Sequence, residues 1–406
     1  MKVLEINSVC GIRSTGRICT DLADVLKAGG HTCRVAYGRE QVPEKYREIA
    51  IRIGSEHGVR WHGLQSRLLG HAGFYSKAAT QKFIQEIEEY QPDLVHLHNL
   101  HGYYLHIGVL FDYLKEKQMP VVWTLHDCWA FTGHCAHFAE VHCDQWKTQC
   151  THCVHTGKYP ACWFGDHVER NFEEKKQLFT ALSNMVIVTP SRWLADNVKA
   201  SFLGKFLVEV IHNGIDQNVF CPTEGNFRKK YHLENKHIIL GVASAWSRSK
   251  GLYDFIELAK RLPDDHRIVL VGLTAKQIAE MPKGILCIER TNNAQELAEI
   301  YTAADVFVNP TWADTFPTVN IEALACGTPV LTYRTGGSPE IADVSCGCVV
   351  EPGDLDGLLR EIDRIIHDHP YSREACLQRA AHYEKSKKFA QYIKLYEKIL
   401  ADSKRN

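Results

Sequence analysis

The sequence lacks the features of membrane-spanning, secreted and nucleic-acid-binding proteins. No run of about 18 apolar residues, the length that a membrane-spanning helix needs, occurs in its 406 residues. Lys and Arg number 47 against 48 Asp and Glu, so no basic excess indicates a nucleic-acid partner. The first residues, Met1–Asn7, have the pattern of a strand and not of a secretory signal. These absences predict a cytoplasmic, soluble enzyme.

A disulfide framework is not expected either, although the chain contains 15 cysteines. Without a secretory signal, cysteines are expected as reduced thiols or metal ligands. Four of them gather in an insertion at 128–166: Cys135, Cys143, Cys150 and Cys153, the last two with C-x-x-C spacing. Four thiolates suit a tetrahedral structural zinc, which would order a loop that has few aliphatic residues. Structural zinc and buried free thiols are the two alternatives.

The first part of the chain alternates strands and helices, and the length predicts two domains. The apolar run Val3–Val9 predicts a buried parallel strand. A loop through Gly16, a helix at Arg17–Ala28 and a second strand at His31–Tyr37 follow. This order predicts an α/β fold with a doubly wound sheet and a loop that tolerates phosphate. The glycine spacing does not match the dinucleotide fingerprint, which argues against a nicotinamide cofactor.

Polar side chains end two further strands of the first domain. His98 and Asn99 end the strand at 93–99, and His126 and Asp127 end the strand at 120–127. Ligands bind at the carboxyl ends of strands in open α/β sheets, so these side chains are candidates for a binding site. The alternative for each histidine is a structural role.

A third candidate segment is Thr311–Glu340. Asp314 precedes an expected helix that has Pro317 at its first position and Glu322 inside it. The N–H groups at a helix N-terminus attract anions such as phosphate, and a carboxylate accepts hydrogen bonds from sugar hydroxyls. One site could therefore hold both parts of a nucleotide sugar. The alternative is a surface helix with two solvated acids.

This segment resembles the signature of glycosyltransferase family 4, whose members are retaining enzymes of the GT-B architecture. Two acids separated by seven residues lead into IEALACGTPVLTYRTGGSPE, with Asp314 where the family usually has Glu. The resemblance continues in IHNGID at 211–216 and in the Lys-Gly pair at Lys250. Ala245 stands where the family has a diphosphate-binding arginine, and Arg248 is the candidate substitute. The cysteine-rich insertion resembles a branch found in surface-polysaccharide synthesis, of the colanic acid or exopolysaccharide type.

The resemblance implies a GT-B fold in which two doubly wound, Rossmann-like domains face a cleft. Residues 1–205 would bind the acceptor, residues 206–385 would bind the donor, and a helix at 386–406 would cross back to the first domain. The implied reaction moves a hexosyl unit, with retention, from a nucleoside diphosphate sugar to a hydroxyl of a saccharide, lipid-linked in this branch.

The resemblance also implies the roles of the candidate residues, and no catalytic metal. The catalytic set is His126, Lys250, Asp314 and Glu322. The donor-binding set is Gly16, Arg248, Lys250, Phe316, Pro317, Thr318, Val319 and Glu322. The acceptor side is His98, Asn99, His126 and Asp127.

Alternatives to this function remain open. A nucleotide-sugar epimerase can share the two-domain architecture, and Ala245 and Asp314 leave room for a non-catalytic nucleotide-sugar-binding subunit. The segment 60–82 combines basic residues with Trp61, Leu64, Leu68 and Leu69 at helical spacing. Such a segment can lie on an anionic bilayer at the inner membrane face, or it can pack on the sheet with a basic rim.

Overall fold

The chain divides into two compact units, which are described separately. The computed structural model describes residues 1–164 and 167–403. Unit 1 consists of Met1–His212 with Lys388–Asn406, and unit 2 consists of Asn213–Lys387. Residues 165 and 166 of the expected insertion and residues 404–406 of the expected last helix lie outside the described residues.

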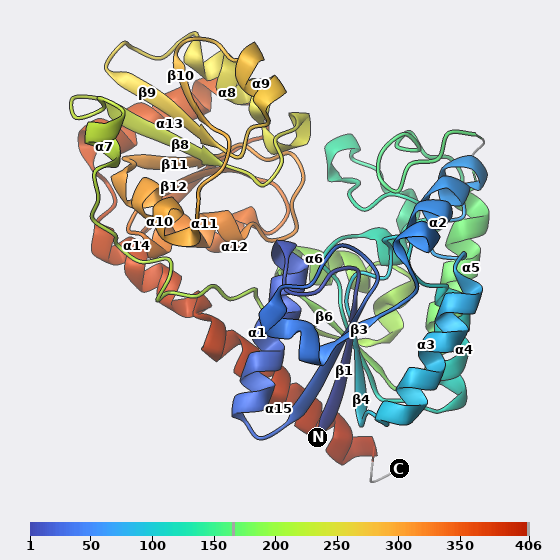
Figure 1. The fold of residues 1–406 in the computed structure, drawn as a ribbon. Helices are drawn as coiled ribbons and strands as arrows, with labels where there is room; N and C mark the ends of the chain where they lie inside the picture. Colours follow the sequence, from blue (N-terminus) through green and yellow to red (C-terminus); the bar gives the residue numbers. More distant parts are fainter. Residues whose placement is uncertain (165–166, 404–406) are drawn as a thin grey trace. The chain divides into compact units, whose positions relative to one another are not determined.

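The described residues of unit 1 form a parallel seven-stranded sheet with the order β3-β2-β1-β4-β5-β6-β7 (Figure 1). The middle strands are almost wholly buried, which explains why they read as continuous apolar runs in the sequence. The strands are β1 (Lys2–Asn7), β2 (Thr32–Tyr37), β3 (Ala50–Arg52), β4 (Leu94–Leu97), β5 (Val121–Thr124), β6 (Met185–Thr189) and β7 (Leu207–Val210).

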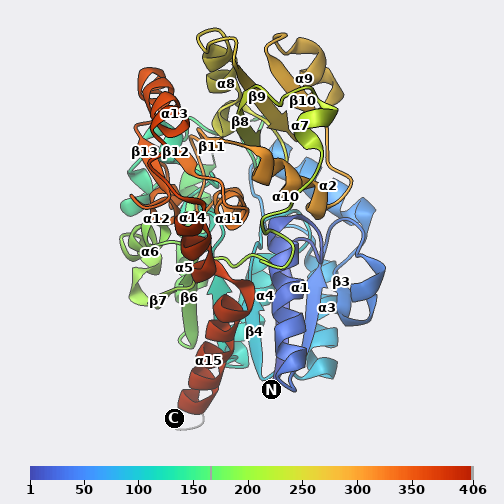
Figure 2. The ribbon, with the colours of Figure 1, turned by 90° about the vertical axis from the view of Figure 1, so that its left-hand side faces the viewer.

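Helices cover both faces of this sheet. On one face α1 (Arg13–Ala28) and α15 (Lys385–Ser403) share a core with β1, β2 and β5, and Figure 2 shows these two helices on the same side of the sheet. The other face packs against α3 (Lys77–Tyr90), α4 (Ile107–Glu116), α5 (Val168–Thr180) and α6 (Arg192–Lys199). A further helix, α2 (Glu56–Leu69), buries few of its side chains.

The described residues of unit 2 form a parallel six-stranded sheet with the order β10-β9-β8-β11-β12-β13. One face packs against α8 (Leu252–Ala259) and α13 (Leu355–Asp368). The other packs against α7 (Phe227–Lys230), α10 (Ala294–Ala303), α11 (Thr318–Ala325), α12 (Ser338–Ile341) and α14 (Arg373–Ala380). The strands are β8 (His237–Val242), β9 (His266–Val271), β10 (Ile285–Ile288), β11 (Val306–Asn309), β12 (Val330–Tyr333) and β13 (Gly347–Val350), and α9 (Ala275–Glu280) precedes β10.

Three local details differ from the sequence expectations. The first helix begins at Arg13 and not at Arg17, so Gly16 lies inside its first turn. Pro317 is the N-cap of α11 and not its first residue. Residues 207–210 pair with β6 as the last strand of the first sheet, so unit 1 extends past the expected boundary at 205/206.

Each sheet has one topological switch point, where the strand order reverses. In unit 1 it lies between β1 and β4, and in unit 2 between β8 and β11. Ligands of doubly wound folds bind outside the carboxyl ends of the strands at this point. The loops that follow β1 and β4, and those that follow β8 and β11, are therefore the places to look for a site.

Candidate functional site

At the switch point of unit 2, the loops after β8 and β11 meet through an ion pair. Lys250 ends a short 3₁₀ turn at Arg248–Lys250, and its Nζ lies 2.6 Å from Oδ2 of Asp314. The other carboxylate oxygen of Asp314 accepts a hydrogen bond from the backbone N–H of Phe316 at 3.2 Å. Asp314 therefore connects the lysine with the segment that leads into α11.

Two glycines allow close approach to the loop after β11, Gly251 from the loop after β8 and Gly336 from the loop after β12. Gly251 has a φ of +77°, and a Cβ there would stand 2.4 Å from the carbonyl oxygen of Pro310. A Cβ at Gly336 would stand 1.7 Å from the carbonyl oxygen of Asp314. Any side chain at either position would push the loops apart and displace Asp314 from Lys250.

The helix that follows carries the second acid. α11 begins after Pro317 without a side-chain cap, and Glu322 lies within it. Tyr301 of α10, which is fully buried, donates a hydrogen bond from its hydroxyl to Oε2 of Glu322 at 3.0 Å. Of the predicted catalytic and donor-binding residues, the structure brings together Lys250, Asp314 and Phe316, with Pro317, Thr318, Val319 and Glu322 following on the same segment. Arg248 is exposed on the loop after β8.

At the switch point of unit 1, the predicted histidines are in contact. Nδ1 of His98 lies 3.0 Å from Nε2 of His126, and the two rings stack with their centroids 5.3 Å apart. Asp127 makes a 2.7 Å contact with Nε2 of His101 and accepts a hydrogen bond from the N–H of Trp129. His101 itself was not predicted from the sequence.

Asn7, which was not predicted from the sequence, connects two predicted residues, Asn99 and Gly16. Asn7, at the end of β1, accepts a hydrogen bond from the N–H of Asn99 at 3.3 Å. Its amide donates to the carbonyl of Val9 and to the hydroxyl of Thr15. Gly16 closes the same loop by accepting from the N–H of Gly11 at 2.9 Å. Asn7 thus ties the glycine loop to the loop after β4.

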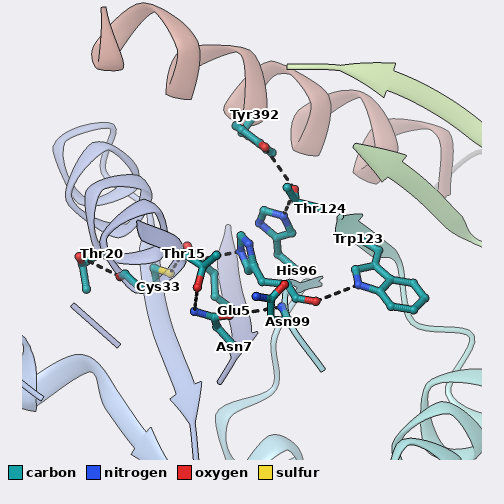
Figure 3. A network of polar contacts seen from close by, with 12 residues as sticks. Glu5, Asn7, Thr15, Thr20, Cys33, His96, Asn99, Trp123, Thr124 and Tyr392 are labelled. Carbon is teal, nitrogen blue, oxygen red and sulfur yellow. Dashed lines mark hydrogen bonds and ion pairs between the residues drawn. The ribbon is translucent and has the colours of Figure 1, made fainter. Parts of the chain in front are cut away.

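A buried carboxyl lies behind the two histidines. Glu5 of β1 has no exposed surface, and its Oε2 lies 3.3 Å from Nε2 of His98. Figure 3 shows Glu5 in a network of polar contacts that also includes Cys33, whose thiol donates to Oε1 of Glu5 at 3.4 Å. An acid in the middle of an apolar strand was the sequence signal for this residue, and it was overlooked.

Burial decides most of the protonation states here. Burial raises the pKa of Glu5 to about 8, although the thiols of Cys19 and Cys33 act in the opposite direction. Burial lowers the pKa of His126 to about 4. For Asp127, burial favours the neutral form, but the neighbouring His101 outweighs it and the pKa falls to about 2. Near neutral pH the site therefore holds a neutral His126 beside an ionised Asp127.

The cysteine-rich insertion contributes to the core of unit 1. Cys135 and Cys150 are buried, Cys143 and Cys153 are half-buried, and all four pack in one hydrophobic cluster. Cys135 and Cys153 share a side-chain hydrogen bond. Among the described residues, potential ligand atoms within 4.8 Å of one another are found on Glu5, His96 and His98. Of the four insertion sulfurs, all on described residues, no three lie that close together, whereas in a tetrahedral zinc site bonds of about 2.3 Å hold all four around one ion.

The apolar residues of helix α2 do not pack on the sheet, which was one of the two alternatives for this segment. Its buried residues are His62, Gly63 and Ser66, whereas Trp61 and Leu69 are 61% and 53% exposed. Leu64 and Leu68 are also exposed, and the insertion adds Trp163 and Phe164, which are 59% and 62% exposed. We call this set the α2 patch: Trp61, Leu64, Leu68, Leu69, Trp163 and Phe164.

Arg67 connects the two parts of the α2 patch. Its carbonyl accepts a hydrogen bond from the N–H of Trp163 at 2.7 Å, and its guanidinium lies 5.9 Å from the centre of the Trp163 ring. None of the described helices combines the length and apolarity needed to cross a bilayer.

Both units match known protein families. Residues 15–219 match the family described as Glycosyltransferase Family 4, and residues 236–368 match Glycosyl transferases group 1. WcaC of Escherichia coli (strain K12), named as a colanic acid biosynthesis glycosyl transferase, is 24% identical over 323 residues, which are 76% of this chain and 77% of WcaC. An MMP alpha-(1->4)-mannosyltransferase of Mycolicibacterium hassiacum is 30% identical over 172 residues, 39% of each chain.

Solved structures share the fold along the whole chain. A sucrose-phosphate synthase from Thermosynechococcus elongatus superimposes with a TM-score of 0.72 at 17% identity, covering 99% of both chains. HepE from Anabaena, solved in complex with UDP-glucose, gives 0.68 at 15% identity and covers 98% of this chain and 100% of its own. The expected fold of two Rossmann-like domains is thereby confirmed.

Proposed function

We propose that this chain, which belongs to glycosyltransferase family 4, moves a hexosyl unit from a nucleoside diphosphate sugar to a saccharide hydroxyl with retention of configuration. Glycosyl transfer follows from the family, and the donor class, the retention and the acceptor are the proposal. The observation that carries it is the contact of Lys250 with Asp314 at the switch point, directly before α11.

In this proposal unit 2 binds the donor. Lys250 and the N-terminus of α11 stabilise the negative charge that grows on the leaving diphosphate, because a fixed cation and oriented N–H groups need no reorganisation during the reaction. Asp314 accepts a hydrogen bond from a sugar hydroxyl, and Glu322 accepts one from the nucleotide ribose. Tyr301 holds Glu322 in place for this. The exposed Arg248 substitutes for the family arginine that Ala245 replaces.

Unit 1 binds the acceptor in the same proposal. His126 orients the acceptor hydroxyl, and His98, Asn99 and Asp127 line the ends of β4 and β5 around it. The leaving phosphate takes the acceptor proton on the same face of the sugar. This front-face reaction needs no carboxylate nucleophile, and Lys250 with the helix N-terminus supplies the positive charge that a catalytic metal would otherwise provide.

The comparisons support a nucleotide sugar and a polysaccharide product. HepE was solved with UDP-glucose, which makes a uridine diphosphate hexose the first donor to test. WcaC, named for colanic acid synthesis, matches this chain over more than three quarters of its length. We therefore propose an acceptor saccharide that belongs to a surface polysaccharide.

We propose further that the acceptor is lipid-linked and that the α2 patch docks on the bilayer that carries it. An amphipathic helix normally buries its apolar face, but α2 buries His62 and exposes Trp61. Tryptophan and leucine side chains suit the boundary between headgroups and acyl chains. Arg60 and Arg67 on the same helix favour an anionic headgroup.

The insertion has a separate proposed role, the binding of one structural zinc by Cys135, Cys143, Cys150 and Cys153. Backbone N–H groups already donate to two of the sulfurs, from Gly133 to Cys150 and from His155 to Cys153, each at 3.4 Å. Four thiolates around zinc carry a net negative charge. The fully buried Lys175 lies close enough to Cys150 and Cys135 to interact electrostatically with them. Binding would draw the four sulfurs closer together.

A labelled-donor assay tests the function. The purified chain is incubated with labelled uridine diphosphate hexoses, with and without a saccharide acceptor. Label in the acceptor product supports transfer, whereas an isomerised donor without acceptor identifies an epimerase. If donors neither raise the melting temperature, as native-state ligands do, nor react, the chain is a non-catalytic subunit. The anomeric configuration of the product decides between retention and inversion.

A further inference from the structure

We propose that Glu5, His98 and His126 form a proton relay, in which the protonation of Glu5 decides whether Nδ1 of His126 donates or accepts a hydrogen bond. The relay lies wholly within unit 1. Only the assignment of His126 to the acceptor rests on the proposed function.

The three groups form a continuous line from the core to the end of β5. Oε2 of Glu5 lies 3.3 Å from Nε2 of His98, and Nδ1 of His98 lies 3.0 Å from Nε2 of His126. Glu5 and His98 are 0% and 2% exposed. Neither Oε2 of Glu5 nor Nε2 of His98 has a hydrogen-bond partner among the described residues, and their 3.3 Å contact does not itself have hydrogen-bond geometry, so the relay requires a rotation of either side chain to align this first link. A buried acid oxygen and a buried ring nitrogen thus have each other as the available partner.

When Glu5 is protonated, each group in the line donates its hydrogen bond to the next, from Glu5 towards His126. The carboxyl donates to Nε2 of His98, so a neutral His98 carries its proton on Nδ1. That N–H donates to Nε2 of His126. A neutral His126 then carries its own proton on Nδ1 and can only donate from that atom.

When Glu5 is ionised, every bond reverses. The carboxylate accepts from Nε2 of His98, Nδ1 of His98 accepts from Nε2 of His126, and Nδ1 of His126 becomes an acceptor. The balance is one proton, which leaves His126 for solvent while one proton shifts along each link. Both histidines remain neutral at the start and at the end.

Glu5 is the member of this cluster that changes charge near neutral pH. Around Glu5 lie Cys10, Cys19 of α1, Cys33 of β2, His96 and His98 of β4, and Tyr392 and Tyr396 of α15. Burial raises the pKa of each of these thiols and phenols and keeps the pKa of both histidines well below the ordinary value. Around His126 stand Asp127, which is ionised, and His101.

A metal ion bound by Glu5, His96 and His98 would be another use of the same atoms. The ring of His96 argues against it. Its Nε2 lies 2.7 Å from the hydroxyl of Thr124, and its Nδ1 lies 2.7 Å from the hydroxyl of Tyr396. Both lone-pair positions of His96 therefore already face hydroxyl groups.

The relay would give transfer a characteristic dependence on pH. An acceptor hydroxyl must point one lone pair at the anomeric carbon and its proton at the leaving phosphate, and its second lone pair can accept a hydrogen bond from Nδ1 of His126. That arrangement requires the protonated form of Glu5. The value of kcat/KM should then fall about tenfold per pH unit above the pKa of Glu5.

NMR of isotope-labelled histidine tests the relay without activity. The signals of His126 are identified by their loss in His126→Gln, and its tautomer is followed on both sides of about pH 8, where Glu5 titrates. In the wild type the proton should move from Nδ1 to Nε2 as pH rises. In Glu5→Gln the amide oxygen takes the place of Oε1, which accepts from the Cys33 thiol, so the amide NH2 faces Nε2 of His98 and donates to it as the protonated acid does. Nδ1 of His126 should therefore stay protonated throughout. An unchanged tautomer shift in Glu5→Gln overturns the relay.

Kinetics separate the relay from the proposed function. If His126 orients the acceptor, Glu5→Gln also removes the falling limb of kcat/KM with pH. If the tautomer of His126 depends on Glu5 but the pH profile of kcat/KM does not, the relay stands and His126 does not orient the acceptor. The variant His98→Gln breaks the middle link and should likewise uncouple the His126 tautomer from pH, which covers a failure of Glu5→Gln to fold.

Discussion

Lys250 and Asp314 form an ion pair with a separation of 2.6 Å between Nζ and Oδ2, and this pair joins the two loops at the switch point of unit 2. The side chains are 36% and 21% exposed, so both can reach a ligand. A diphosphate that binds Lys250 would compete with Asp314 for the same cation. Donor binding and the position of Asp314 are therefore coupled.

The first prediction is that Lys250→Ala lowers turnover by about a hundredfold or more, as expected for the loss of one stabiliser of transition-state charge. Steady-state transfer rates at saturating donor measure the effect. The matched control is Lys260→Ala, because Lys260 is a surface lysine of the same unit that pairs with Glu257. Wild-type turnover in folded Lys250→Ala would remove this lysine from the active site.

The second prediction is that Glu322 and Asp314 bind different parts of the same donor molecule. Glu322→Gln should weaken binding of the free nucleoside diphosphate as well as of the donor, because hydrogen bonds to a charged acceptor contribute about 1.5–3 kcal/mol against about 1 for neutral ones. Asp314→Asn should leave the affinity for the bare nucleotide unchanged or raise it, because it removes the anion that competes for Lys250. It should still lower turnover of the full donor.

Calorimetry with nucleotide and with donor, on both variants, measures this division. Asp356→Asn is the control, since Asp356 pairs with Arg261 on the surface of unit 2. Equal weakening of bare nucleotide by both substitutions, or by neither, would contradict the assigned roles.

Much of the fold could be predicted from the sequence because buried parallel strands are short apolar runs. β1 and β2 were located within a residue or two in this way. The ends were less certain. Pro317 suits both the N-cap and the first position of a helix, and only the backbone shows that it is the N-cap.

The candidate site could be predicted only where a motif marks it. Lys250, Asp314 and Glu322 lie in such motifs, but their partner Tyr301 lies in an ordinary amphipathic helix. Glu5 was missed because the rest of its strand is apolar. The apolar residues of α2 followed helical spacing, yet spacing cannot tell whether the apolar face meets the core or solvent.

The third prediction concerns metal in the insertion. The chain, purified without chelator, should contain about one zinc, and the double variant Cys150→Ser/Cys153→Ser should lose it and melt at a lower temperature, since metal binding contributes to folding. Cys221→Ser, at a half-buried cysteine of unit 2, is the control. A metal-free wild type in which all four insertion thiols react freely would favour buried thiols.

The fourth prediction is that the α2 patch binds anionic bilayers. At low salt the chain should float with vesicles containing phosphatidylglycerol more than with phosphatidylcholine alone, and Trp61→Ser/Leu64→Ser should lose most of this binding. The control is Tyr253→Ser, which removes an equally exposed aromatic side chain, 61% exposed, from unit 2. Equal recovery with both vesicle types, or full binding by the double variant, would indicate an acceptor that is not presented on a membrane.

The last prediction is that Glu5→Gln stabilises the chain increasingly as pH rises. Burial raises the pKa of Glu5 from its ordinary 4.5 to about 8, so between these values the folded state binds a proton that the unfolded state has released. The stability of the wild type must therefore fall with rising pH in that window. Glutamine has no proton to release, and the stability difference between variant and wild type should grow by roughly 3 kcal/mol from about pH 5 to about pH 8. Urea denaturation across this range measures it, with Glu44→Gln, whose side chain is 89% exposed, as the control. A constant difference would show that Glu5 is ionised throughout, and the relay to His126 would then have no switch.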